Sequence, residues 1–238
     1  SGGGTLAIPA GATLTTTGGS NNDVYLDNVT VSNAGLFNLS QPNGNHVTYL
    51  NNGATFNNQA GGEVRFTGLD NQLVTSAGVG TFNNFGLVKS GGQNINVGVS
   101  AANYLGGGTI DAASKTAYLY SGTNNFGGSQ TFNGSVVAAG GAHVYADGTV
   151  VGGTGALTQS GGAVTLNTVQ MNVPYSLATG NVLTVASGRT ATMAGGMGIN
   201  ADGADTTVNG GGTLAIPAGW SAPSTTGSAR CSSSSKRR

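Results

Sequence analysis

The segments GATFNNQAGGEVRF at residues 53–66 and GTFNNFGLVKSGG at residues 80–92 share a Thr-Phe-Asn-Asn sequence, and Phe56 and Phe82 are 26 positions apart. A related TFNG segment contains Phe132, which lies 50 positions beyond Phe82 and so close to two such steps. Between them, residues 106–110 read GGGTI. Periods of about 20–50 residues are typical of solenoids, in which each repeat buries its apolar side only when neighbouring repeats stack on it. The spacing therefore predicts a repeat architecture.

Short apolar segments recur along nearly the whole chain, separated by Gly, Asn or Gly-Gly; examples are EVRF at 63–66 and AVTL at 163–166. Many alternate between apolar and polar residues, as half-buried strands do. No stretch carries apolar residues at helical spacing over three turns. We therefore expect an all-β, elongated parallel β-helix (β-solenoid) with about three short strands and roughly 20–26 residues per coil.

The inward side chains of such a fold stack on their counterparts in the next coil, and we expect one of them per strand. Gly and Asn are expected at the corners, because they adopt positive φ at the lowest cost. The predicted core residues are Leu6, Phe56, Phe82, Ile110, Phe132, Leu157 and Leu214.

The decapeptide GGGTLAIPAG occurs twice, at residues 2–11 and at residues 210–219. We interpret the two copies as the same coil element of a longer array. The β-solenoid domain is accordingly predicted over residues 1–219. Residues 220–238 lose the apolar pattern and end in a Ser run and basic residues, which predicts a low-complexity tail, either a linker or a non-native addition.

Composition excludes several classes of protein. The 238 residues include 44 Gly, 8 basic and 8 acidic residues, and the formal net charge is zero. A hydrophobic content of 37% argues against disorder, and scattered basic residues argue against a nucleic-acid partner. No apolar run approaches the ~18 residues of a membrane-spanning helix, so we expect no membrane insertion within this segment. A single cysteine, Cys231, provides neither a disulfide framework nor a thiolate metal site.

Residues 119–140, LYSGTNNFGGSQTFNGSVVAAG, resemble the autotransporter-associated β-strand repeat of bacterial surface proteins. The matching positions are Ser121, Gly122, Asn124, Phe126, Gly127, Gly128, Thr131, Phe132, Asn133 and Gly134. The match departs from the family pattern directly after Phe126, where the family usually has a polar residue before the Gly pair. The resemblance covers about a tenth of the chain and implies a right-handed β-helical passenger or stalk exported to a bacterial surface. It implies no active site, because these repeats are scaffold motifs.

Carboxylates were the first candidates for chemistry, because glycosidases need two of them across the scissile bond. The eight acids are Asp23, Asp27, Glu63, Asp70, Asp111, Asp147, Asp202 and Asp205. Glu63 and Arg65 share a face of one predicted strand, and we interpret them as an outward ion pair. The NADGAD segment at 200–205 is similar to one copy of a calcium-binding nonapeptide repeat, but a plain turn is the favoured interpretation.

Histidine and threonine supply the remaining candidates. His143 and Asp147 could form a base with its orienting partner, but no nucleophile motif accompanies them, and His46 is isolated. The Thr-rich segments at 13–17 and 189–192 could belong to an ice-binding face, which would need Thr on the same side of every coil. We therefore predict no catalytic, cofactor-binding or metal-binding residue.

These observations favour a structural or adhesive repeat segment of a secreted or cell-surface bacterial protein, such as a stalk, a fibre or a surface scaffold. Expected partners are further copies of the chain, end to end or side by side, and surface glycans bound weakly. Its export signal and anchor would lie outside this segment. A β-helical polysaccharide lyase or glycosidase is the alternative, and an ice-binding protein is a minor one.

Overall fold

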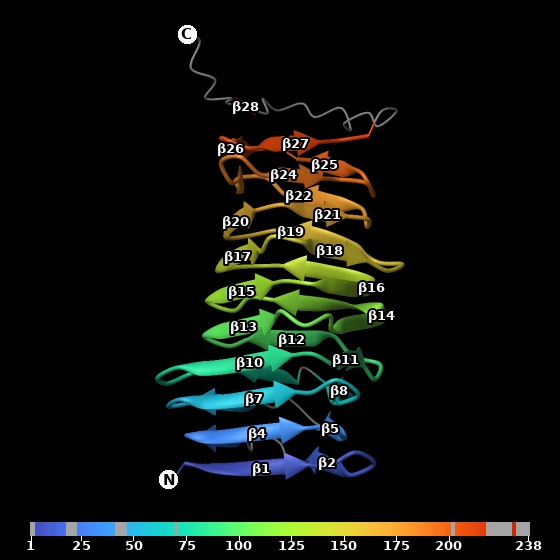
Figure 1. The fold of residues 1–238 in the computed structure, drawn as a ribbon. Coiled ribbons are helices and arrows are strands. Elements are labelled where there is room, and N and C mark those ends of the chain that lie inside the picture. The colour runs from blue at the N-terminus through green and yellow to red at the C-terminus, as the bar shows by residue number, and fades with distance from the viewer. Residues whose placement is uncertain are drawn as a thin grey trace.

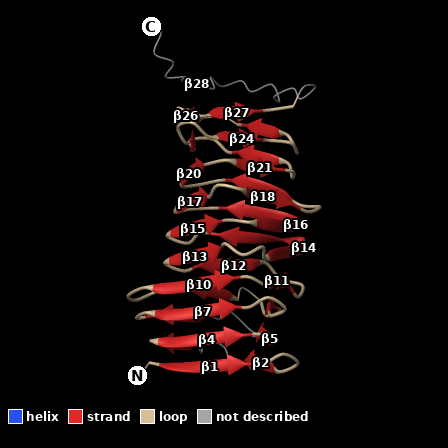
Figure 2. Ribbon diagram, in the orientation of Figure 1, coloured by secondary structure: helices blue, strands red, loops and turns tan. Residues whose placement is uncertain are grey.

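The chain forms a column of stacked coils built from strands and turns (Figures 1 and 2). The computed structural model describes residues 3–17, 23–40, 47–69, 71–200, 203–217 and 230–231. Over these residues it contains strands and no helix, and the coils make about 9 turns of roughly 22 residues each. The predicted fold class is confirmed. The described residues include no helix that is long and apolar enough to cross a membrane.

Each coil contributes strands to three faces, which we name A, B and C in chain order, and all strand pairings are parallel. Face A is a separate sheet, whereas faces B and C form one sheet because β14 and β16 each continue around the corner between them.

Face A contains β1 (Gly4–Ile8), β4 (Val29–Asn33), β7 (Ala54–Asn58), β10 (Gly80–Asn84), β13 (Ala101–Tyr104), β15 (Thr123–Phe126), β17 (Ala142–Tyr145), β20 (Ala163–Leu166), β23 (Val182–Val185), β26 (Thr207–Gly210) and β28 (Arg230–Cys231). Face B contains β2 (Thr13–Thr16), β5 (Leu36–Leu39), β8 (Glu63–Phe66), β11 (Leu87–Ser90), the first parts of β14 (Thr109–Leu119) and β16 (Ser129–Ala138), β18 (Thr149–Gly152), β21 (Val169–Met171), β24 (Thr190–Thr192) and β27 (Thr213–Ala215). Face C contains β3 (Val24–Asp27), β6 (Val47–Asn51), β9 (Gln72–Val74), β12 (Ile95–Gly98), the last parts of β14 and β16, β19 (Ala156–Gln159), β22 (Tyr175–Leu177) and β25 (Met197–Ile199).

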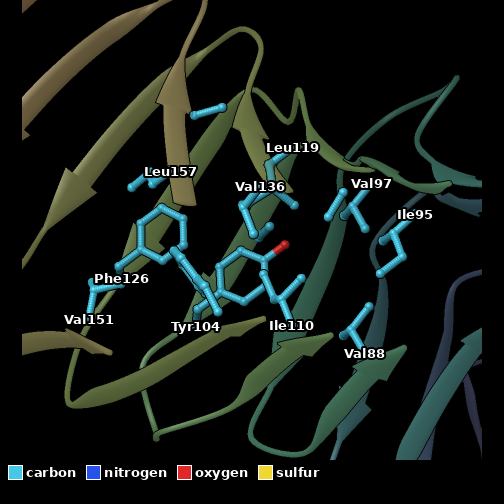
Figure 3. Close-up of a cluster of buried hydrophobic side chains, with 14 of the residues drawn as sticks. Val88, Ile95, Val97, Tyr104, Ile110, Leu119, Phe126, Val136, Val151 and Leu157 are labelled. Carbon is cyan, nitrogen blue, oxygen red and sulfur yellow. The ribbon is translucent and has the colours of Figure 1, made fainter. Parts of the chain in front are cut away.

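The core runs along the axis and is lined by alternate residues of most strands, two in β5, β8 and β15 and three in β7 and β10, rather than the one expected. Aromatic rings follow one another from coil to coil, with centroids 4.9 Å apart for Phe37 and Phe56 and 5.7 Å apart for Phe56 and Phe82. Tyr104 and Phe126 continue the stack at 5.0 Å. Figure 3 shows Tyr104 and Phe126 surrounded by aliphatic side chains from faces B and C. This buried column is what holds the coils together.

Most predicted core residues lie in this column. Phe56, Phe82, Ile110, Phe132 and Leu157 are at most 1% exposed, and Leu214 is partly buried against the core. The prediction for Leu6 is wrong, because its side chain is 36% exposed. Leu6 does occupy the inward position, in register with the fully buried Val31, but β1 is the terminal strand of face A and no described coil covers it.

Two predicted equivalences also fail. Phe132 does not continue the Phe82 column, because it lies on face B in register with Ile110, whereas Phe82 pairs with Ala102 on face A. The two decapeptide copies lie on different faces: the first forms β1 on face A, and the second enters β27 on face B. The second copy follows β26, which already fills the face A position of that coil, so the chain has reached face B by Thr213.

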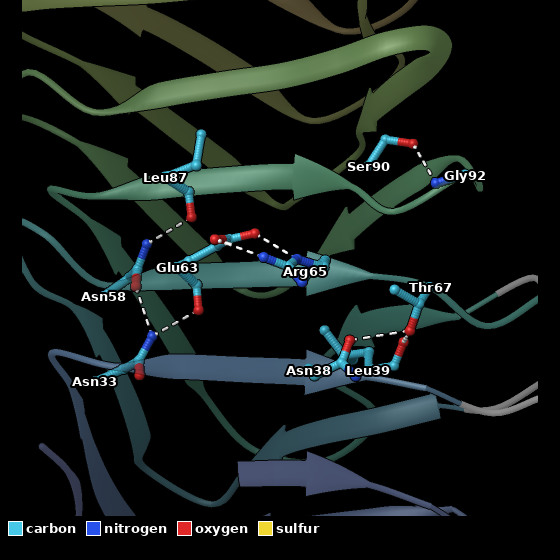
Figure 4. A network of polar contacts seen from close by, with 10 residues as sticks. All are labelled: Asn33, Asn38, Leu39, Asn58, Glu63, Arg65, Thr67, Leu87, Ser90 and Gly92. Carbon is cyan, nitrogen blue, oxygen red and sulfur yellow. Dashed lines mark hydrogen bonds and ion pairs between the residues drawn. The ribbon is translucent and has the colours of Figure 1, made fainter. Parts of the chain in front are cut away.

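Asparagine forms a second, polar column inside the corner between faces A and B (Figure 4). Asn33 donates to Asn58 Oδ1 at 2.8 Å, and Asn58 donates to Asn84 Oδ1 at 2.7 Å. The same amide groups donate to the backbone carbonyls of Glu63 at 2.9 Å and Leu87 at 3.1 Å. All three Asn side chains are buried, and these bonds satisfy donors that would otherwise destabilise the interior.

The segment resembling the autotransporter-associated repeat covers one turn of the column, from Leu119 at the end of β14 to β16. Ser121, Asn124 and Phe126 are buried, and Gly128 has a φ of 64°. Within the predicted tail, β28 pairs with β26, and the domain boundary near residue 219 stays a prediction.

Replacing Phe82 with Ala should lower the free energy of unfolding by about 3–5 kcal/mol, because the change opens a cavity between Phe56 and Tyr104 in the column. Phe85→Ala is the matched control, since the Phe85 side chain is 40% exposed, and it should cost less than about 1 kcal/mol. Urea unfolding followed by circular dichroism measures both. Equal effects of the two changes would contradict the assignment of Phe82 to the core.

Candidate functional site

The outer side of face A carries two straight columns of side chains, because alternate residues of its strands point away from the core. In register, the first column consists of Thr5, Thr30, Thr55, Thr81, Ala101, Thr123, Ala142, Ala163, Val182 and Thr207. The second consists of Ala7, Ser32, Asn57, Asn83, Asn103, Asn125, Val144, Thr165, Thr184 and Asn209. We call these the Thr column and the Asn column. From β1 to β26 neither column contains a charged or aromatic residue, and beyond Thr207 the register of the Thr column continues to Arg230 of β28.

The amides of the Asn column bind one another along the axis. Asn83 donates to Asn57 Oδ1 at 2.7 Å, and Asn103 donates to Asn83 Oδ1 at 2.8 Å. Asn125 donates in turn to Asn103 Oδ1 at 2.8 Å. Each bond fixes the orientation of an amide group that is only partly buried, so its remaining donor and acceptor face solvent in a set direction.

A stacked aromatic pair projects from face C. The rings of Tyr25 and Tyr49 are 4.9 Å apart and nearly parallel, and Tyr25 is 59% exposed. Burial raises the pKa of Tyr49, and the neighbouring Asp23 and Tyr25 add to this shift. Tyr49 is therefore a neutral phenol at physiological pH, and the pair offers an aromatic surface.

The carboxylates are dispersed over the described residues. Glu63 and Arg65 form the predicted outward ion pair on face B, with Nε–Oε1 and Nη2–Oε2 distances of 2.6 Å and 3.0 Å. Such an exposed pair stabilises a fold by ~0–1 kcal/mol. Asp70 and Asp202 lie outside the described residues. Within the described part of the chain, no three His, Cys, Asp or Glu side chains gather in a group that could hold a metal ion.

His143 and Asp147 point to different surroundings. His143 lies inside the column, in register with Asn124 and Val164, and is fully buried. Asp147 is exposed, accepts the backbone N–H of Thr168 at 3.0 Å, and pairs with Arg189 at 3.0 Å. The Thr168 N–H is the main reason that the pKa of Asp147 is lowered, and Arg189 contributes less. His46 and residues 201–202 of the NADGAD segment lie outside the described residues.

Neither Thr-rich segment considered for an ice-binding face forms one, and in the second segment Thr192 lies on face B in register with Gln170 and Ala215. Thr13 and Thr15 lie on face B in register with Leu36 and Asn38, and the next coil places Glu63 and Arg65 there. Sequence reasoning missed the Thr and Asn columns of face A. Their signal was a recurring Thr-x-Asn or Thr-x-Ser triplet, at residues 30–32, 55–57, 81–83, 123–125 and 207–209.

No protein-family model, no curated protein and no solved structure matches the chain significantly.

The stability of the coil should depend on pH through His143. Burial lowers the pKa of His143 to about 4, partly opposed by the backbone of Gly140, whereas the unfolded chain titrates near 6.5. The unfolded state therefore binds more protons below pH 6.5. The contribution of His143 to the free energy of unfolding should be constant above that pH and fall by up to about 3 kcal/mol as the pH drops to 4.

His143→Leu should remove this part of the pH dependence. Urea unfolding of both chains between pH 4 and pH 8 measures the difference, in which the titration of Asp147 and other carboxylates cancels. If the two chains lost stability in parallel below pH 6.5, the buried position of His143 would be contradicted.

Proposed function

We propose that the chain is a structural and adhesive segment, a rigid stalk of a secreted or cell-surface bacterial protein. The single observation that supports this most is the parallel strand pairing between successive coils, which continues on all three faces through about 9 turns, with a register shift between Asp111 and Thr116 where β14 turns from face B to face C. At about 4.8 Å per turn, such a stack spans roughly 40 Å.

The surface of this stalk suits weak contacts repeated many times. The Tyr25–Tyr49 pair of face C presents an aromatic surface on which sugar rings can pack. Single contacts of this kind are weak, but many copies on one surface bind together through avidity. Surface glycans are therefore the proposed partners of face C.

The carbohydrate-active alternative receives less support. Glu63 is engaged by Arg65, and Asp147 by Thr168 and Arg189. These two carboxylates belong to coils far apart along the column, on β8 and after β17. A glycosidase would need two carboxyl groups within about 10 Å of each other across a substrate.

Beads coated densely with the chain should adhere to glycan-coated surfaces, whereas the free monomer should bind them only weakly. The change Tyr25→Ala with Tyr49→Ala should reduce bead adhesion severalfold, because it removes the stacking surface. Tyr118→Ala is the matched control, since Tyr118 is a single, partly buried tyrosine of β14.

Two outcomes would count against this function. Equal adhesion of the double variant and the control would exclude the tyrosine pair as the contact surface. Release of new reducing ends from a panel of polysaccharides incubated with the chain would replace the adhesive proposal with the enzymatic one.

We also propose that the stalk associates end to end. The outer edge of β1 has no partner strand among the described residues, and Leu6 exposes an inward-facing apolar side chain at the same end. An unpaired strand edge beside an uncovered apolar side chain favours the addition of a second copy of the chain.

Leu6→Lys should therefore weaken association, because it places a charge where a second copy would pack. Leu69→Lys is the control, since Leu69 is also exposed, at 47%, but lies away from β1 in the loop after β8. Sedimentation velocity over a concentration series should show larger species for the unchanged chain and the control only. Monomers throughout, for all three chains, would contradict the proposal.

A further inference from the structure

We propose that the outer side of face A is an ice-binding surface, with the Thr and Asn columns as its contact groups. This goes beyond the proposed stalk and its glycan contacts, which use face C. The ligand is an ordered water lattice, and the argument depends on three properties of the two columns: their spacing, their rigidity and their lack of charge.

The spacing of the columns is regular in two directions. Successive coils place their strands about 4.8 Å apart, and alternate residues along one strand are about 6.6 Å apart. Thr30, Thr55 and Thr81 follow one another in consecutive coils beside Ser32, Asn57 and Asn83. The face therefore carries a hydroxyl beside an amide on β7, β10, β15 and β26, on a grid of a few ångströms, whereas the Thr column holds Ala or Val on β13, β17, β20 and β23. Ice presents oxygen atoms on a surface lattice of the same scale. When one side chain of the face lies over a lattice position, its neighbours therefore lie over further positions as well.

The contact groups are held in place before any ligand arrives. The Asn amides of β7, β10, β13 and β15 are joined by hydrogen bonds of 2.7–2.8 Å along the axis. Thr side chains are β-branched and restricted at χ1, and those of the Thr column stand on a sheet whose backbone groups are already paired. Little conformational entropy remains to be lost on binding, which is what allows individually weak water contacts to add up.

The chemistry of the face distinguishes water from other ligands. From β1 to β26 its two columns hold Thr, Asn, Ser, Ala and Val only, so this part of the face attracts neither polyanions nor polycations. They contain no aromatic ring for a sugar to stack on, in contrast to Tyr25 and Tyr49 on face C. The hydroxyl and amide groups suit a ligand that offers hydrogen bonds at fixed intervals. The methyl groups between them suit water molecules that form a clathrate-like cage over apolar surface.

The test uses the intact chain and ice itself as the probe. Thermal hysteresis in a nanolitre osmometer, and partition of the labelled chain into a growing ice shell, are measured for four chains. These are the unchanged chain, Thr81→Tyr, the double change Thr55→Tyr with Thr81→Tyr, and the control Thr158→Tyr with Ser176→Tyr. The control residues are neighbours in register on the outer side of face C, as Thr55 and Thr81 are on face A.

The unchanged chain and the control should shape ice crystals and enter the ice. The double variant should lose about tenfold or more of both activities, because two bulky rings in the middle of the grid lift the remaining groups from the lattice, and the single variant should lose part. Circular dichroism and urea unfolding check that all four chains keep the same fold.

Three results would overturn the proposal: no hysteresis and no partition of the unchanged chain, full activity of the double variant, or equal loss in the control. Each would leave the adhesive proposal untouched, since bead adhesion to glycans is measured above freezing and depends on face C. Conversely, loss of adhesion in the Tyr25 and Tyr49 variant should leave the ice measurements unchanged.

Discussion

Parallel, in-register pairing between successive coils is the constraint on which the rest of this structure depends. On each face a residue lies beside its counterpart in the next coil, so like residues at one position form a column along the axis. Phe56 beside Phe82 produces the aromatic column, Asn58 beside Asn84 produces the inner amide column, and Asn57 beside Asn83 produces the outer one. The same register thus determines which side chains stack in the core, at the corner and on the outer surface. Stability and surface pattern have the same cause.

The corners absorb the differences in coil length. Residues paired by hydrogen bonds along the axis are 26 positions apart for Asn57 and Asn83, but 20 apart for Asn83 and Asn103. The shortening does not disturb the pairing on face A, because residues are removed between strands and not within them. Where the chain passes from face A to face B, the backbone of adjacent coils comes very close. A Cβ on Gly62 would lie 2.3 Å from the carbonyl oxygen of Asn33, which explains glycine at that corner.

The sequence predicted the class of fold and most of the core because like residues recur where coils stack. Phe56 and Phe82 were identified by their spacing, and both are buried. Phe132 was assigned to the wrong column because the spacing was assumed constant, and shorter coils shift later segments to another face. The prediction for Leu6 failed because the alternation of apolar and polar residues around it is that of a core strand. That alternation does not reveal that no described coil covers the other side of Leu6. The Thr and Asn columns needed the register itself, since they appear only when five triplets are aligned across coils of unequal length.

The same register determines which substitutions and insertions the outer surface of face A tolerates. Thr81 and Asn83 flank the buried Phe82 on one strand, so a slip of a single residue would turn the ring to solvent and the polar side chains into the core. Substitutions at outward positions leave the aromatic column in place, and insertions at the corners leave the pairing in place. An insertion within a strand of face A preserves neither. The residues of the outer columns can therefore be substituted one by one without loss of the fold. The spacing of those columns, in contrast, is fixed by the core beneath them. A ligand that binds through this regular spacing therefore depends on the aromatic column as much as on the hydroxyl and amide groups that contact it.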